Sequence, residues 1–143
     1  MPCLLAQTVR VYLEDTDAGG IVYHASWLRF FERARTDWLR TFGIEQSTFG
    51  TAAEVNFVVS DMQIEFIRPG RLDQLVRTEL RLLEARKASL TLHQRACCVS
   101  SGQALATAHV RLAATRRSDA RPIGLPAQLI AHLKTSRPYN LPN

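Results

Sequence analysis

Two carboxylates and two glycines stand together in residues 15–20, which read Asp-Thr-Asp-Ala-Gly-Gly. Glycine allows tight backbone turns, and aspartate before a helix commonly caps a turn. A helical pattern follows, and the free N–H groups of a helix's first turn act like about half a positive charge. They can polarise a carbonyl oxygen while a nearby carboxylate acts as nucleophile or general base on the same carbonyl. Asp15 and Asp17 are therefore either turn residues or candidates for carbonyl chemistry.

A strand before this stretch and a helix after it must hold it in place. Alternating Val9, Val11 and Leu13 predict a strand that runs into the acidic loop. Large apolar side chains then recur on one stripe of a helix, and Gly43 is expected to end that helix. The stripe comprises Trp27, Phe31, Ala34, Trp38 and Phe42, flanked by Leu28 and Leu39, with Arg29, Arg33, Thr36, Asp37 and Arg40 opposite. Burying it requires a sheet or a second hydrophobic layer.

Four further strands are expected after the helix, joined mainly by short turns. The apolar alternation changes phase between Val59 and Met62, which predicts a bulge near Ser60-Asp61. The segments are a loop over Phe49–Ala53, a turn at Arg68–Arg71, strands over Asp73–Glu84, Ser89–Val99 and Ala104–Leu112, and a short helix from Pro126. Inward-facing alanines in the last strand leave room for the long helix. This order predicts an α+β fold, with one antiparallel sheet curled around a central helix.

Size and composition restrict the broad class of protein. At 143 residues the chain is expected to form one domain, residues 1–143, with a flexible tail over about residues 135–143. No apolar run approaches the roughly 20 residues that span a membrane. The first residues do not resemble a secretory signal, and the three cysteines lack CxxC spacing. These features predict a cytoplasmic protein.

The formal net charge of +5 could suit nucleic acid, but the basic residues are spread along the chain apart from Arg86-Lys87 and Arg116-Arg117. No nucleic-acid-binding motif is visible, so a small polyanionic ligand such as a nucleotide-bearing cofactor is favoured. A calcium loop starting at Asp15 fails, because Gly19 occupies the fifth position, which needs an oxygen ligand, and Ser26 occupies the twelfth, which needs a glutamate. The four histidines show no zinc-ligand spacing, so no metal site is predicted. A DxD phosphotransferase and a Ser-His-Asp triad lack their usual structural contexts.

Residues 14–27 (Glu-Asp-Thr-Asp-Ala-Gly-Gly-Ile-Val-Tyr-His-Ala-Ser-Trp) and 31–36 (Phe-Glu-Arg-Ala-Arg-Thr) resemble the 4-hydroxybenzoyl-CoA thioesterase family of hotdog-fold proteins, and most closely its Tol-Pal-associated branch. The similarity extends to residues 56–59, 62–66 and 69–73, so it covers most of the chain up to about residue 112. It implies a hotdog fold, a five-stranded antiparallel sheet wrapped around one long central helix. It also implies an acyl-CoA thioesterase that releases a free acid and CoA with no metal or separate cofactor.

The resemblance assigns roles to individual residues of the loop and the helix start. Asp17 takes the position of the catalytic carboxylate, as nucleophile or through a water molecule. The backbone N–H near His24 matches the group that polarises the thioester oxygen, and the His24 imidazole is expected to orient substrate or handle a proton. Tyr23 is expected to line the acyl pocket, or else simply to pack. Gly20 and Val22 are assigned to the same substrate-binding region.

Two further assignments keep alternatives open. Arg86, Lys87 and Ser89 lie at a turn between strands whose counterpart in the family is near the CoA nucleotide, and a solvated basic turn is the other interpretation. Arg35 falls within the apolar stripe of the helix, where a charge needs a partner or a route to water. Glu32 and an acid across a dimer interface are both candidate partners.

The resemblance further implies a homodimer or homotetramer with active sites at a dimer interface. Acyl carrier protein stays open as the alternative to CoA, and so does the choice between aliphatic and aromatic acyl groups. A hotdog-fold dehydratase or hydratase is a second hypothesis, although the seven-residue spacing of Asp17 and His24 fits the thioesterase pattern better. A non-catalytic module that binds acyl groups or proteins is the third.

Overall fold

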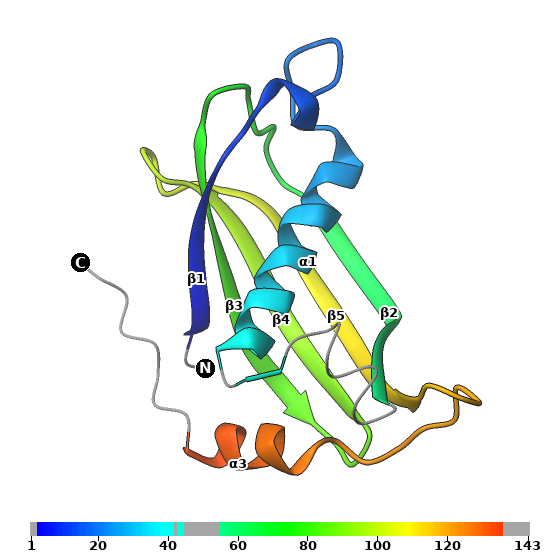
Figure 1. Cartoon of the computed structure of the whole chain (residues 1–143). Coiled ribbons are helices and arrows are strands. Elements are labelled where there is room, and N and C mark those ends of the chain that lie inside the picture. The colour runs from blue at the N-terminus through cyan, green and yellow to red at the C-terminus, as the bar shows by residue number, and fades with distance from the viewer. Residues whose placement is uncertain (1–2, 42, 45–54, 136–143) are drawn as a thin grey trace.

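The computed structural model describes residues 3–41, 43–44 and 55–135. Its elements are β1 (Cys3–Arg10), a 3-10 turn (Leu13–Asp15), α1 (His24–Arg40), β2 (Val55–Phe66), β3 (Leu75–Ala85), β4 (Ser89–Cys98), β5 (Ala104–Arg116) and α3 (Ala127–Thr135). The strands form one sheet in the order β1-β3-β4-β5-β2, and every neighbouring pair is antiparallel. Helix α1 lies across one face of this sheet (Figure 1). The predicted loop 49–53, Phe42 and the tail after residue 135 lie outside the described residues.

Helix α1 buries the stripe that its sequence predicts, with one addition. Trp27, Phe31, Ala34 and Trp38 are all buried, and Phe30 joins them although the stripe omitted it. Thr36 and Asp37 were expected to face solvent but are only partly exposed. Asp37 is drawn toward the sheet because its carboxylate accepts a hydrogen bond from the Gln7 side chain on β1 at 2.6 Å.

The first strand ends earlier than its alternation predicts. Its pairing with β3 stops at Arg10 opposite Leu75, and residues 13–15 form a 3-10 turn instead of continuing the strand. The Asp15 carboxylate explains the difference, because its Oδ2 accepts the Tyr12 N–H at 2.8 Å and so takes a donor that a ladder would use. Val11 is still fully buried although it follows the last residue of β1, so the apolar alternation in the sequence extends beyond the end of the strand.

The remaining strands are present where the sequence predicts them, and so is the predicted irregularity in β2. The register of β2 against β5 shifts between Val59 and Asp61, which is the predicted bulge. The pairs β3–β4 and β4–β5 are hairpins, as the short turns predicted. The turn predicted at Arg68–Arg71 connects two strands that are not neighbours, because β2 lies at one edge of the sheet and β3 lies three strands away. Gly43 follows the helix with φ of +86°, as expected for a helix stop.

The inward faces of the strands complete one apolar cluster with α1. Ala96, Ala106, Ala108 and Ala114 are at most 1% exposed, which confirms that small side chains face the helix-bearing side. The predicted C-terminal helix is present as α3, and its Leu129 is fully buried in the same cluster. No helix among the described residues is long and apolar enough to cross a membrane.

Candidate active site

Two free amide groups stand at the start of α1. The helix begins at His24 after an extended Tyr23 that supplies no side-chain cap. The Tyr23 N–H donates to the Asp15 carbonyl at 2.9 Å, and the Ser26 N–H donates to the Tyr23 carbonyl at 2.8 Å. Within the described residues, the N–H groups of His24 and Ala25 have no acceptor. They are thus free to bind an oxygen that carries negative charge.

The Asp17 carboxylate is exposed and serves the turn before the helix with one of its oxygens. Its Oδ1 accepts the N–H groups of Gly19 at 2.9 Å and Ile21 at 3.2 Å. The Asp17 N–H in turn donates to the Ile21 carbonyl at 2.8 Å, and Gly20 adopts a φ of +77° that favours glycine. The turn role expected of an aspartate here is therefore present. Among the described residues no donor reaches Oδ2, so this oxygen is available for chemistry.

A pocket of about 240 Å³ opens beside the start of α1. It is lined by Ile21, Val22, His24 and Trp27 and by residues 66–69, which follow from the end of β2. The His24 ring lies 6.4 Å from that of Phe66, edge to face, and 4.3 Å from that of Tyr23. Of the residues assigned to the site, His24 and Val22 line this pocket, whereas Asp17, Gly20 and Tyr23 do not. Asp17 and Gly20 lie in the preceding turn, and Tyr23 is exposed.

Because Gly70 has no side chain, its backbone can pack closely against two residues that line this pocket. Its carbonyl accepts the Val22 N–H at 2.8 Å, and a Cβ at this position would lie 2.8 Å from Trp27 Cζ2 and 2.9 Å from Val22 Cγ2. The sequence analysis did not assign residues 66–69 to the site. They lie about forty positions after the helix start in the chain, and only the fold brings the two segments together.

Replacing Gly70 by alanine should destabilise the protein by about 1–3 kcal/mol, because the new methyl group overlaps two buried side chains. Urea unfolding would measure the loss. Gly124→Ala is the matched control, since the nearest atom to its added Cβ is the Lys87 carbonyl oxygen at 3.9 Å. That variant should be neutral or slightly more stable. Equal stability of both variants would contradict the close packing described here.

The residues assigned to the CoA nucleotide lie at the opposite end of the sheet. The start of α1 follows the end of β1, which pairs with the beginning of β3, whereas Arg86, Lys87 and Ser89 follow the end of β3. Figure 1 shows the two groups at opposite ends of β3. Because this strand has 11 residues, its ends are roughly 30 Å apart. One chain alone therefore does not bring the two groups together. Arg86 is exposed and paired with Glu84 at 2.9 Å, so the solvated-turn interpretation fits the isolated chain.

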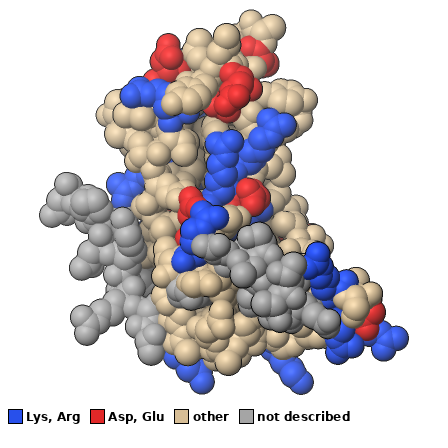
Figure 2. Space-filling model, viewed as in Figure 1, with Lys and Arg blue, Asp and Glu red and all other residues tan. Residues whose placement is uncertain are grey.

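Charge is distributed unevenly between these two ends. Figure 2 shows acidic side chains next to basic ones at the end where α1 starts, and mainly basic side chains at the end where β3 meets β4. Basic side chains also lie over the middle of this face, so they form no single stripe of the kind that tracks a nucleic-acid backbone. Among the described residues, no group of three or more His, Cys, Asp or Glu side chains could hold a metal ion.

Arg35 has a partner that the sequence analysis missed. Its Nη1 donates to the side-chain oxygen of Gln94 on β4 at 2.9 Å, while the Gln94 Nε2 donates to the Phe31 carbonyl at 2.9 Å. Glu32 forms no ion pair with it in the described part of the chain and instead accepts a hydrogen bond from Thr36. Burial lowers the pKa of Arg35, and the charge of Glu32 partly offsets that effect. Strict alternation of Leu90, Leu92, Gln94 and Ala96 could have placed Gln94 inside.

The architecture, with a helix start and its pocket on one face of a five-stranded antiparallel sheet, defines the class of hotdog thioesterases. A probable thioesterase from Bartonella henselae has this fold with a TM-score of 0.76 and 33% identity, and the match covers 85% of this chain and 98% of that chain. The crystal structure of a 1,4-dihydroxy-2-naphthoyl-CoA thioesterase from Synechocystis matches with a TM-score of 0.85 at 19% identity, over 91% of this chain and 95% of the other.

The chain belongs to the thioesterase-like superfamily, whose family model matches residues 11–133. Among its relatives, the acyl-CoA thioesterase YbgC of Haemophilus influenzae is 39% identical over 129 residues, which cover 88% of this chain and 93% of that protein. The acyl-CoA thioester hydrolase YbgC of Escherichia coli is also 39% identical, over 126 residues that cover 88% of this chain and 92% of the relative.

Proposed function

We propose that this protein is an acyl-CoA thioesterase, which hydrolyses an acyl-CoA thioester to a free acid and CoA. Its relatives with 39% identity are named for this activity and match nearly their whole length. One structural observation supports the assignment to this site. The free N–H groups of His24 and Ala25 stand beside a pocket, next to a turn that leaves one oxygen of Asp17 available.

In the proposed reaction, the thioester oxygen accepts hydrogen bonds from the N–H groups of His24 and Ala25, which stabilise its developing negative charge. Asp17 Oδ2 then either attacks the thioester carbon or takes a proton from a water molecule that attacks it. In the first case an acyl–Asp17 anhydride forms as the C–S bond breaks, and water then hydrolyses it. In both cases the CoA thiolate leaves and takes up a proton, for which the His24 imidazole is the proposed donor. No metal or separate cofactor takes part.

The working unit is proposed to be a homodimer, because one chain separates the acidic turn from the basic turn. Strand β2 pairs with β5 on one side, and no strand of the described chain covers its other side. Val58, Val59 and Phe66 of this strand are each more than 40% exposed, a combination that favours association. Two β2 strands paired antiparallel around a two-fold axis would put the 86–89 turn of one copy at the helix-start end of the other.

Charge also supports this pairing, since it sets the end that carries the acidic turn in one copy beside the mainly basic end of its partner. Arg86 and Lys87 from the partner copy would then contact the phosphates of CoA, with Ser89 beside them. Helix α1 acts as the central helix of each copy, and Tyr23, Gly20 and Val22 contact substrate near the interface. We also propose that the protein can form a homotetramer and that it is cytoplasmic. Acyl carrier protein is proposed as an alternative to CoA as the thiol carrier.

Thiol release from a panel of acyl-CoAs tests the function directly. The panel should include short, medium and long saturated chains together with benzoyl-CoA, and free CoA should be detected with a thiol reagent. We expect turnover of at least one member, and sedimentation analysis should show a dimer or a larger closed assembly. Absence of thiol release from every member would reject the thioesterase and favour an acyl-binding module. Hydration of an enoyl-CoA without thiol release would favour a hydratase.

A further inference from the structure

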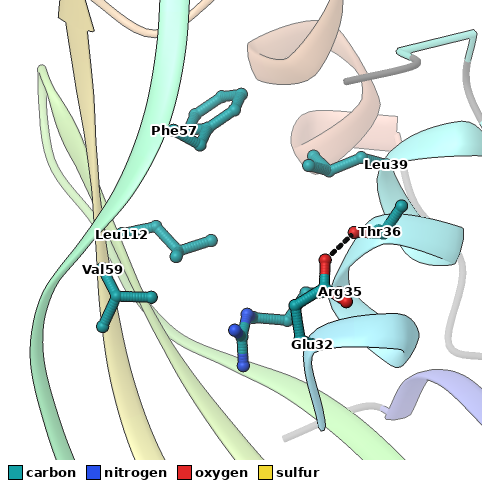
Figure 3. A pocket seen from close by; sticks show the side chains of 7 residues that line it. All are labelled: Glu32, Arg35, Thr36, Leu39, Phe57, Val59 and Leu112. Atoms are coloured by element: carbon teal, nitrogen blue, oxygen red, sulfur yellow. Dashed lines mark hydrogen bonds between the residues drawn. The ribbon is translucent and has the colours of Figure 1, made fainter. Parts of the chain in front are cut away.

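A second pocket lies between α1 and the sheet, further along the helix than His24. It has a volume of about 120 Å³, several times the roughly 30 Å³ that one water molecule occupies in the liquid. Phe57, Val59 and Leu112 form its wall on the strands, and Leu39 closes it on the helix (Figure 3). A pocket with such walls suits a small group that carries apolar atoms.

Two charged side chains, Arg35 and Glu32, line this pocket from the helix side together with Thr36, opposite its apolar wall on the strands. Arg35 is only 7% exposed, and Figure 3 shows its guanidinium projecting from α1 toward the strands. Its single hydrogen bond in the described part of the chain goes to Gln94, so one of its five donors is engaged there. No described carboxylate lies within ion-pairing distance, and Glu32 bonds to Thr36 instead (Figure 3).

A nearly buried guanidinium with no carboxylate within ion-pairing distance is unfavourable, because burial removes the water that would solvate it. Burial also lowers the pKa of Arg35, and the charge of Glu32 offsets only part of that effect. Gln94 supplies a neutral oxygen on one side, and its own amide is held by the Phe31 carbonyl, so the guanidinium is kept in a fixed orientation. Fixed, planar donors facing a small cavity match the bidentate geometry of a carboxylate.

The position of Arg35 relates this pocket to the thioester site. His24 and Arg35 are eleven residues apart on one helix, which corresponds to about 16 Å along its axis. Helical side chains lean toward the N-terminus, so the guanidinium lies closer to the thioester site than that distance. Residues of β2 line both pockets, Phe66 the first and Phe57 and Val59 the second. Both pockets are thus bordered by α1 and β2, and an acyl chain that reaches Arg35 from the helix start has to follow these two elements.

We propose that Arg35, oriented by Gln94, binds a carboxylate at the far end of the acyl group, so that the preferred substrates are ω-carboxyacyl-CoA thioesters. This inference rests on the proposed thioesterase function and adds a class of acyl group to it. Arg35 acts as a specificity residue, because it contacts the substrate far from the reacting carbon.

Matched pairs of substrates test this subsite. Adipoyl-, suberoyl- and sebacoyl-CoA would be compared with hexanoyl-, octanoyl- and decanoyl-CoA, and the ratio of kcat/KM within each pair is the measurement. At the best length the carboxylated substrate should be favoured about tenfold to 100-fold, as expected for a hydrogen-bonded charge pair. Arg35→Met should bring that ratio to one or below.

Gln94→Glu is the second variant, because it tests the subsite without removing the buried arginine. It supplies an internal carboxylate to Arg35 in nearly the same volume, so it too should abolish the preference. Arg29→Met is the matched control on the exposed face of α1 and should leave the ratio unchanged.

Ratios near one at every length in the native protein, with normal hydrolysis of the uncharged chains, would overturn the subsite and leave the thioesterase standing. An unchanged preference in both Arg35→Met and Gln94→Glu would also overturn it. If no thioester is hydrolysed, the proposed function itself fails. In that case the subsite is tested by calorimetry, which compares the binding of a non-hydrolysable suberoyl-CoA thioether with that of its octanoyl analogue. Tighter binding of the suberoyl form that is lost in Gln94→Glu supports the subsite. Equal binding of the two compounds rejects the subsite.

Discussion

Replacing Asp17 by asparagine should remove nearly all thioester hydrolysis and leave the fold intact. The Asn side chain keeps a carbonyl oxygen that can accept the N–H groups of Gly19 and Ile21, so the turn retains both of its hydrogen bonds. What disappears is the negative charge on the second oxygen, which the reaction needs as nucleophile or base. The expected fall in kcat is about 10²–10⁴-fold, measured as thiol release per folded protein.

Asp15→Asn is the matched control, since it makes the same chemical change two residues away. The Asp15 carboxylate is 8% exposed and accepts the Tyr12 N–H at 2.8 Å, a bond that an amide oxygen can also accept. This variant should therefore keep most of its activity. Circular dichroism and urea unfolding would verify that both variants are folded. Near-normal turnover by a folded Asp17→Asn protein would exclude the proposed role.

Isotope labelling separates the two roles that remain open for this carboxylate. A single turnover in H₂¹⁸O places the label in the released acid if Asp17 activates water. If Asp17 is the nucleophile and water attacks its carboxyl carbon in the anhydride, the label appears in the Asp17 side chain, and mass spectrometry of the peptide detects it. The exposure of Asp17 gives water ready access in either case.

Local periodicity predicted the elements of this fold well, because side-chain alternation and helical spacing are properties of short segments. The bulge between Val59 and Asp61 is an example, since a change of phase within one strand requires an extra residue. The end of β1 could not be predicted in this way. It depends on the Asp15 side chain competing with the sheet for the Tyr12 N–H.

The same distinction between local and long-range contacts separates the site residues that the sequence could predict from those that it could not. The helix start at His24 and the turn at Asp17 lie in one continuous segment, so the sequence places them near each other. The pocket beside His24 depends on Phe66 and its neighbours, which only the tertiary fold brings to the helix start. The partner of Arg35 also lies on a distant strand, so helix spacing suggested Glu32 where the fold supplies Gln94.

The basic turn should act across the dimer interface, and mixed dimers can reveal this. Arg86→Ala/Lys87→Ala removes two cations from an exposed turn, where Arg86 contributes only one exposed ion pair with Glu84. Stability should therefore change little, while KM for acyl-CoA should rise about tenfold or more through lost contacts to phosphate. An unchanged KM would mean that this turn is merely solvated.

When this double variant is refolded together with Asp17→Asn, each mixed dimer contains one site with Asp17 from one chain and the basic turn from the other. About half of the dimers are mixed and one of their two sites is intact, so at substrate concentrations well below KM these dimers should supply about a quarter of the native kcat/KM. As a control, Asp17→Asn mixed with a chain that carries all three substitutions has no site with Asp17 and should stay inactive. Absence of rescue in the first mixture would place Asp17 and the basic turn that serves it within one chain, which the roughly 30 Å between the two ends of β3 makes difficult.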